Sequence, residues 1–218
     1  MKRILAGVIA AACISSAAGP KAAVAHSTAA EGAAEAAGAL GGEARSGSKR
    51  PPMAGASRIC ERQMAQAAAK HGVPLGMLYA VGLTESGNRG SLQPYAMNIG
   101  GKAYFGSGAA DVMQRLAQAQ QEGVRLVDLG CMQINHHYHR AKFASLEAMI
   151  DPAQNVEYAT RFLKELKERE GSWTLAVARY HAGPNNNPAQ KVYVCRVITN
   201  MVATGFGNWT PGAKTFCQ

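Results

Sequence analysis

Glycine and proline divide most of this chain into short segments with helical periodicity, and this feature limits the fold more than any other. The segment that begins at Pro74 illustrates it, because proline suits a first helical turn and a Ser-Gly-Asn turn follows at the far end. Its larger apolar residues recur at i, i+3, i+4 and i+8, on one helix face: Leu75, Leu78, Tyr79 and Leu83. A carboxylate, Glu85, stands in the last turn, where the apolar stretch ends.

The same signals predict a mainly α domain. The predicted helices cover residues 59–72, 73–87, 109–123, 151–171, 173–182 and 188–201, the last of them weakened by β-branched residues. Residues 95–105 indicate two short strands around Gly100-Gly101, which is a small β-hairpin insert. Residues 125–139 are first apolar and then polar and irregular. No internal repeat is visible.

The N-terminal part has a different composition. Residues 1–25 have the charged start, apolar stretch and small-x-small end of an export signal, although cleavage near Ala18 fits as well. A lipoprotein signal through Cys13 is weaker, because Ala10 stands where Leu or Val is usual. Residues 26–57 are rich in Ala, Gly, Ser and Pro, so we expect a disordered linker. The domain then covers 58–218, and the protein is expected to be periplasmic or secreted.

Charge and cysteines fit an exported protein. The net charge is +9, and loss of Lys2, Arg3 and Lys21 with the signal lowers it to +6, which suits an anionic partner such as cell wall. Four cysteines remain without Cys13, and an even number favours two disulfides in an oxidising compartment. Of the three possible pairings, we expect Cys60 with Cys195 and Cys131 with Cys217.

Three polar motifs interrupt the predicted helices. They are Glu85-Ser86-Gly87, the stretch 130–135 that reads G-C-M-Q-I-N, and the stretch 179–183 that reads R-Y-H-A-G. In this order and spacing they resemble the catalytic domain of soluble lytic transglycosylases, which has a goose-type-lysozyme-like fold, over about residues 58–205. The hairpin and "VDLGCMQIN" look most like the branch associated with type IV secretion and other cell-envelope machines.

The resemblance implies a peptidoglycan lytic transglycosylase that cleaves the MurNAc–GlcNAc β-1,4 bond and leaves 1,6-anhydroMurNAc ends. In the family the residue matching Glu85 is the general acid and later the base. Chemistry agrees, because a carboxyl beside apolar groups has a raised pKa and a glycosidic bond needs a proton on its leaving oxygen. The catalytic glutamate of lysozyme shows the same effect in a different fold. Tyr180 matches the family tyrosine that approaches the acid and the glycan.

Other residues are candidates for the saccharide cleft. Gln133 and Asn135 are uncharged hydrogen-bonding residues, which could also satisfy a tight turn. Asn98 and Tyr95 could edge the cleft from the hairpin. The motifs also contain Ser86 and Met132, for which a helix-end cap and core packing are the favoured interpretations. Asp111 and Asp128 could supply a second carboxylate, but a helix cap and a structural position explain them more simply.

Several alternatives stay open. A muramidase would hydrolyse the same bond with water, and a non-catalytic wall-binding assembly factor would bind glycan without cleaving it. The histidines do not match zinc-ligand spacing and indicate solvated or glycan-facing side chains: His136, His137, His139 and His181. We expect no metal, no cofactor and no nucleic acid. The expected partners of the monomer are peptidoglycan strands and an envelope-spanning secretion or flagellar complex.

Overall fold

A computed structural model describes residues 58–183 and 187–218. The predicted signal at 1–25 and the linker at 26–57 lie outside these residues. The helices are α2 (Ile59–His71), α3 (Leu75–Ser86), α4 (Ala109–Gln121), α5 (His136–His139), α6 (Leu146–Ile150), α7 (Pro152–Glu170), α8 (Trp173–Ala182), α9 (Asn187–Ala203) and α10 (Pro211–Cys217), with a short 3₁₀ helix η1 (Arg140–Lys142). The strands are β1 (Ala96–Ile99), β2 (Lys102–Phe105), β3 (Val127–Leu129) and β4 (Ile134–Asn135).

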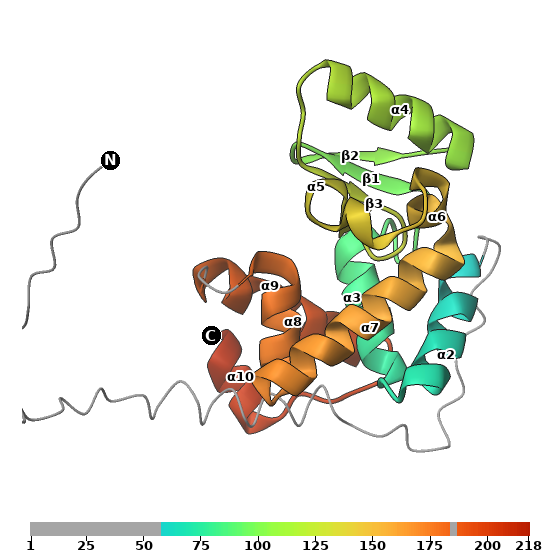
Figure 1. Cartoon of the computed structure of the whole chain (residues 1–218). Coiled ribbons are helices and arrows are strands. Elements are labelled where there is room, and N and C mark those ends of the chain that lie inside the picture. The colour runs from blue at the N-terminus through green and yellow to red at the C-terminus, as the bar shows by residue number, and fades with distance from the viewer. Residues whose placement is uncertain (1–57, 184–186) are drawn as a thin grey trace, which may run out of the picture.

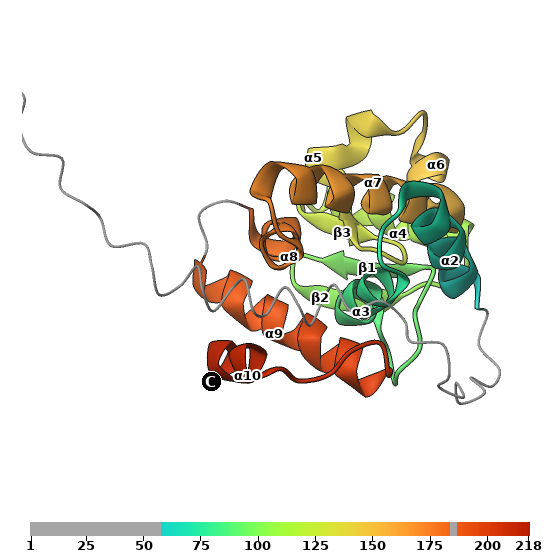
Figure 2. The same ribbon diagram turned by 90° about the horizontal axis from the view of Figure 1, so that it is seen from below.

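The helices form one packed group, with the sheet and α4 at one end (Figure 1). Within the group α2 packs on α7, α3 packs on α9, and α8 packs on both α7 and α9. The view from below shows α3 between α2 and α9 (Figure 2). The mainly α, lysozyme-like fold with a small β insert is confirmed.

Helix α3 is buried on nearly every side rather than on the single face expected from its periodicity. Met77, Leu78, Ala80 and Val81 are all fully buried, although they point in different directions around the axis. Such a helix belongs in the core. The consequence is that Glu85, in its last turn, is held at the edge of the protein interior.

Local helix signals are confirmed where they are strongest. Asp151 accepts a hydrogen bond from the backbone N–H of Gln154, Pro152 occupies the first turn, and Gly171 ends α7 in the left-handed conformation. The predicted final helix is also present, as α9. It is not the last, however, since Thr210 caps the short helix α10, which was not predicted from the sequence.

The predicted hairpin is part of a larger antiparallel sheet in the order β2-β1-β3-β4. Asn98 pairs with Ala103 on one side and with Asp128 on the other. Strands β3 and β4 lie within residues 125–139, where the sequence is first apolar and then polar and irregular and predicts no strand. They are only three and two residues long, which is too short for an alternation of apolar and polar residues to indicate a strand.

The two disulfides join Cys60 to Cys131 and Cys195 to Cys217, so the expected pairing was wrong. The first links the start of α2 to the turn between β3 and β4. The second is local, because α10 packs back on α9. No helix in the described part of the chain is long and apolar enough to cross a membrane.

Candidate active site

The carboxyl group of Glu85 lies where α3, α8 and α9 approach one another. Its side chain is only 14% exposed. The Tyr193 hydroxyl, from α9, donates a hydrogen bond of 2.6 Å to its Oε1 atom. Tyr193 was not predicted as a site residue, because one tyrosine in a helix rich in valine gives no signal that separates a site residue from a core residue.

Burial raises the pKa of Glu85 from its ordinary value of 4.5 to about 8. The hydrogen bond from Tyr193 acts in the opposite direction, because it stabilises the ionised form. The negative charge of Asp128 adds to the rise. Glu85 therefore keeps its proton near neutral pH, as a group that must donate one requires.

His181 lies beside this pair. Its ring stacks on the ring of Tyr193 with centroids 4.2 Å apart and planes 2° from parallel. Its Nδ1 atom is 3.9 Å from Glu85 Oε1, which is too long for a hydrogen bond. Burial, with the nearby charge of Arg196, lowers the pKa of His181, so the neutral imidazole is favoured. A neutral ring places no positive charge beside Glu85, so it does not favour loss of the Glu85 proton. The stacking also fixes the plane of the Tyr193 ring.

Tyr180 lies close to Glu85 without bonding to it. Its hydroxyl donates to the backbone carbonyl of Met132 over 2.7 Å, which joins α8 to the middle motif. Burial and the negative charge of Glu85 raise the pKa of Tyr180 well above its usual value. Its ring also contacts Phe162 of α7. The phenol thus stays protonated at the edge of the site.

Gln133 shapes the middle motif through its backbone and its amide. Its φ of 46° is in the left-handed region, which is uncommon for a residue with a side chain. Its Nε2 atom donates to the carbonyls of Ala96 and Gly130, each over 3.0 Å. These bonds tie the β3–β4 turn to β1. The amide N–H groups of Gln133 therefore stabilise the turn itself, as the interpretation of a tight turn predicts.

The buried amide of Asn155 supports the same turn from α7. Its Oδ1 atom accepts from the backbone N–H of Met132, and its Nδ2 atom donates to the carbonyls of Leu129 and Met149. Gly130 packs against this amide, where a Cβ atom would come within 2.7 Å. Asn155 was not identified from the sequence, because helix α7 gives its polar residues no distinguishing pattern.

Asn135 and Asp128 form a second polar pair near Glu85. The Nδ2 atom of Asn135 donates to Oδ1 of Asp128 over 2.7 Å, and its Oδ1 atom accepts from the backbone N–H of Tyr138 at the start of α5. Burial raises the pKa of Asp128, and the bond from Asn135 opposes that rise. The negative charge of Asp128 thus raises the pKa of Glu85, while the Asn135 amide holds one oxygen of Asp128.

The remaining candidates lie in structural positions. Ser86 is buried and donates to the carbonyls of Gly82 and Cys131, and Met132 is fully buried in the core. This burial agrees with the favoured interpretations, which are a helix-end position for Ser86 and core packing for Met132. Asn98 accepts from the backbone N–H of Gly101 in the hairpin turn, and half-buried Tyr95 packs against the core.

Asp111 and His139 also have structural partners. Asp111, in the first turn of α4, accepts bonds from the Ser107 backbone N–H and hydroxyl and from the Tyr104 hydroxyl. These partners give it a structural role, although the N-cap residue of α4 is Gly108 and not Asp111. The Nδ1 atom of His139 is 2.8 Å from the Tyr158 hydroxyl. Within the described residues, no three His, Cys, Asp or Glu side chains are grouped closely enough to hold a metal ion.

Comparison with known proteins gives one match. The model of the transglycosylase SLT domain family matches residues 62–196, which is more than half of the chain and includes all three motifs. Neither the curated proteins nor the solved structures give a match. The chain therefore belongs to the transglycosylase SLT domain family, which indicates transglycosylase-type cleavage of peptidoglycan.

Proposed function

We propose that the protein is a lytic transglycosylase in which Glu85 is the general acid and base. It cleaves the β-1,4 bond between MurNAc and GlcNAc and leaves a 1,6-anhydroMurNAc end. The single observation that supports this most is the nearly buried Glu85 carboxyl, whose pKa is about 8. A carboxyl that is still protonated at neutral pH can donate to the leaving glycosidic oxygen.

The reaction has two proton transfers through one carboxyl group. Glu85 first gives its proton to the bridging oxygen, the bond between that oxygen and C1 of MurNAc breaks, and an oxocarbenium-like centre develops at C1. The Glu85 carboxylate then takes the proton of the C6 hydroxyl, and the C6 oxygen bonds to C1. The carboxyl ends protonated again, and no water is consumed.

The neighbours of Glu85 suit both steps. Burial favours the protonated acid that begins the cycle. The Tyr193 hydroxyl, 2.6 Å away, stabilises the carboxylate that exists between the two transfers. Because the pKa of Tyr193 is raised well above its usual value by burial and by the charge of Glu85, this phenol remains a donor throughout.

A muramidase is the nearest alternative and would need a base that activates water. Asp128 is the acidic residue whose charge acts on Glu85, but Asn135 holds one of its oxygens at 2.7 Å. This engagement favours the intramolecular route, in which the substrate supplies its own hydroxyl. The second alternative is an assembly factor that binds glycan and does not cleave it.

Mass spectrometry of muropeptides released from purified sacculi tests the three functions. The wild-type protein is expected to release anhydro-muropeptides, and Glu85→Gln is expected to release none. Reducing-end products that are lost in Glu85→Gln would support the muramidase instead. Glycan binding without products from either protein would support the assembly factor.

The cellular setting is part of the proposal. We infer export by the segment 1–25, a catalytic domain over 58–218 and a periplasmic or secreted location, which the two disulfides favour. A local cutting role beside an envelope-spanning secretion or flagellar complex follows from the motif resemblance. Normal secretion, motility and envelope assembly in a deletion strain would contradict that role.

A further inference from the structure

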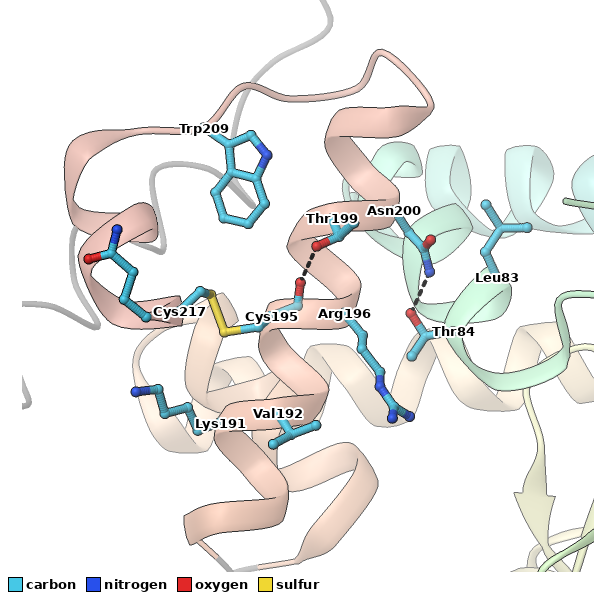
Figure 3. A pocket seen from close by; sticks show the side chains of 11 residues that line it. Leu83, Thr84, Lys191, Val192, Cys195, Arg196, Thr199, Asn200, Trp209 and Cys217 are labelled. Carbon is cyan, nitrogen blue, oxygen red and sulfur yellow. Dashed lines mark hydrogen bonds between the residues drawn. A yellow bond between two sulfur atoms is a disulfide. The ribbon is translucent and has the colours of Figure 1, made fainter.

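A groove of about 720 Å³ lies beside the last turn of α3, between that helix, α9 and α10 (Figure 3). Leu83 and Thr84, which directly precede Glu85, form one side of it. Trp209, on the connection to α10, lines the other side together with the disulfide of Cys195 and Cys217. This volume is in the range of sites that hold small ligands or short peptides.

The groove is held in shape by bonds between its walls. The Nδ2 atom of Asn200, on α9, donates to the Thr84 hydroxyl over 2.9 Å, which joins α9 to α3. On the opposite side the disulfide fixes α10 against α9. A site whose walls are already fixed loses less entropy when it binds a ligand.

The charged side chains of the groove are both basic. Lys191 and Arg196 line it from α9, and both are exposed. Among the described residues, no acidic side chain lines the groove and neither cation pairs with one. In Figure 3, Lys191 extends on the side of α10 and Arg196 on the side of α3. Two exposed cations without acidic partners favour an anionic ligand, and a guanidinium can hold a carboxylate with two hydrogen bonds.

The groove also adjoins the reacting centre of the proposed reaction. Arg196 stands one helical turn after Tyr193, the residue that bonds to Glu85. Its charge also acts on His181, 3.9 Å from the carboxyl group. In peptidoglycan, each MurNAc carries a short peptide on its lactyl group, and that peptide bears free carboxylates. An enzyme that cleaves at MurNAc must therefore place a stem peptide close to its acid.

We propose that this groove binds the peptide stem of peptidoglycan, with Arg196 and Lys191 holding its free carboxylates while the sugar chain lies against Glu85. The inference rests on the proposed function, since it assigns a second part of the same substrate. It makes the protein selective for glycan that still carries stems. An acidic protein partner would use the same charges, and the experiments below separate it.

Binding can be measured without catalysis. Trp209 and Trp173 are the two tryptophans of the chain, so Trp173→Phe leaves Trp209 as its sole indole. Titration of this protein with the synthetic peptide L-Ala-γ-D-Glu-diaminopimelate is expected to change the Trp209 fluorescence to saturation. Adding Arg196→Gln and Lys191→Gln, or amidating the carboxylates of the peptide, is expected to weaken binding about tenfold or more.

A charge-matched control excludes a general effect of net charge. Arg125→Gln with Lys164→Gln removes the same charge from exposed residues outside the groove, and binding is expected to be unchanged. Equal weakening by both pairs of substitutions would overturn the proposal. So would equal binding of the amidated peptide, or equal binding of polyglutamate, which would indicate an acidic protein or a non-specific polyanion.

Cleavage assays test selectivity on two forms of the same glycan, one with its stems and one stripped by an amidase. The wild type is expected to cleave the stem-bearing strands faster. The groove variant is expected to lose this preference because its KM rises more on the stem-bearing strands than on the stripped ones, and its thermal unfolding is expected to stay unchanged. A preference that survives in the variant, or equal losses on both strands, would overturn the proposal.

The two proposals fail in different ways. Peptide binding that depends on Arg196, without cleavage of either strand, would keep the groove and reject the proposed reaction. Cleavage of both strands that depends on Glu85, without peptide binding, would keep the reaction and reject the groove.

Discussion

The Tyr193 hydroxyl donates a hydrogen bond of 2.6 Å to the Glu85 carboxyl across 108 positions of sequence. The bond joins the last turn of α3 to the first half of α9, two helices that pack along each other. It also opposes the main effect of the site, since burial raises the pKa of Glu85 and this bond lowers it. The pKa of about 8 is the balance of these two effects and the charge of Asp128.

Tyr193→Phe is expected to move the alkaline limb of the pH–activity profile to higher pH. Activity requires protonated Glu85, so it falls as pH rises through the pKa of that group, about 8. Without the bond the ionised form is less stable and the pKa rises. The carboxylate between the two transfers also loses its donor, so kcat is expected to fall roughly tenfold to a hundredfold. Muropeptide release measured between pH 5 and 10 gives both quantities.

Tyr180→Phe is the matched control, because Tyr180 donates to the Met132 carbonyl and not to Glu85. Its alkaline limb is expected to stay where it is in the wild type. A Tyr193→Phe limb at the wild-type position would show that the bond to Glu85 does not set the pKa.

The raised pKa of Glu85 also predicts how the free energy of unfolding depends on pH. Its pKa is raised on folding, so between about 4.5 and 8 the folded protein keeps a proton that the unfolded chain releases. The contribution of protonated Glu85 to the free energy of unfolding is complete below about pH 4.5 and is lost as pH rises through about 8. Over this window the free energy of unfolding is expected to fall by on the order of 1 kcal/mol per pH unit.

Glu85→Gln removes this titration, so its unfolding free energy is expected to depend less on pH and to exceed that of the wild type at pH 8. Urea unfolding at pH 5 and pH 8 measures the difference. The exposed Glu168→Gln is the control and should follow the wild type. A parallel pH dependence in Glu85→Gln and the wild type would mean that the carboxyl is not buried in solution.

Much of the fold could be predicted because its signals are local. Helix α7 is specified within its own sequence by a capping Asp151, by Pro152 in the first turn and by Gly171 after the end. The hairpin of β1 and β2 is marked by Gly100-Gly101. Glu85 could be identified because an acid at the end of a buried helix is unusual, and the family motif supports the same residue.

The rest depends on contacts between distant segments. Strands β3 and β4 are too short to show a period, and their pairing depends on β1 and on the Asn155 amide. The disulfide pairing could not be predicted, because it depends on where α10 folds back along α9. Tyr193 becomes a site residue only once α9 brings it to Glu85, and no residue near it in sequence marks this. His181 lies in the third motif, but its place beside Glu85 and Tyr193 depends on how α8 and α9 pack.

Gly130→Ala is expected to destabilise the protein by about 2–3 kcal/mol, with the middle motif affected first. Gly130 has a φ of 80°, and an added Cβ atom would lie 2.7 Å from the Asn155 amide, which holds the turn in three hydrogen bonds. Gly101→Ala is the control, since its φ is 90° and a Cβ there meets nothing within 4 Å. Gly101→Ala should lower the free energy of unfolding by about 1 kcal/mol, through backbone strain alone. Equal losses in urea unfolding would show that the contact with Asn155 adds nothing.

The two disulfides are expected to contribute unequally to stability. The bond between Cys60 and Cys131 spans 71 positions, and the bond between Cys195 and Cys217 spans 22. Because a longer closed loop restricts the unfolded chain more, the first is expected to stabilise the protein by about 1 kcal/mol more than the second. Replacing each pair by two alanines and measuring urea unfolding under non-reducing conditions tests this order. Cys60 and Cys131 are also fully buried, so their loss removes core contacts in the same direction. The opposite order would indicate that the short loop at α9 and α10 makes the larger contribution to holding the fold.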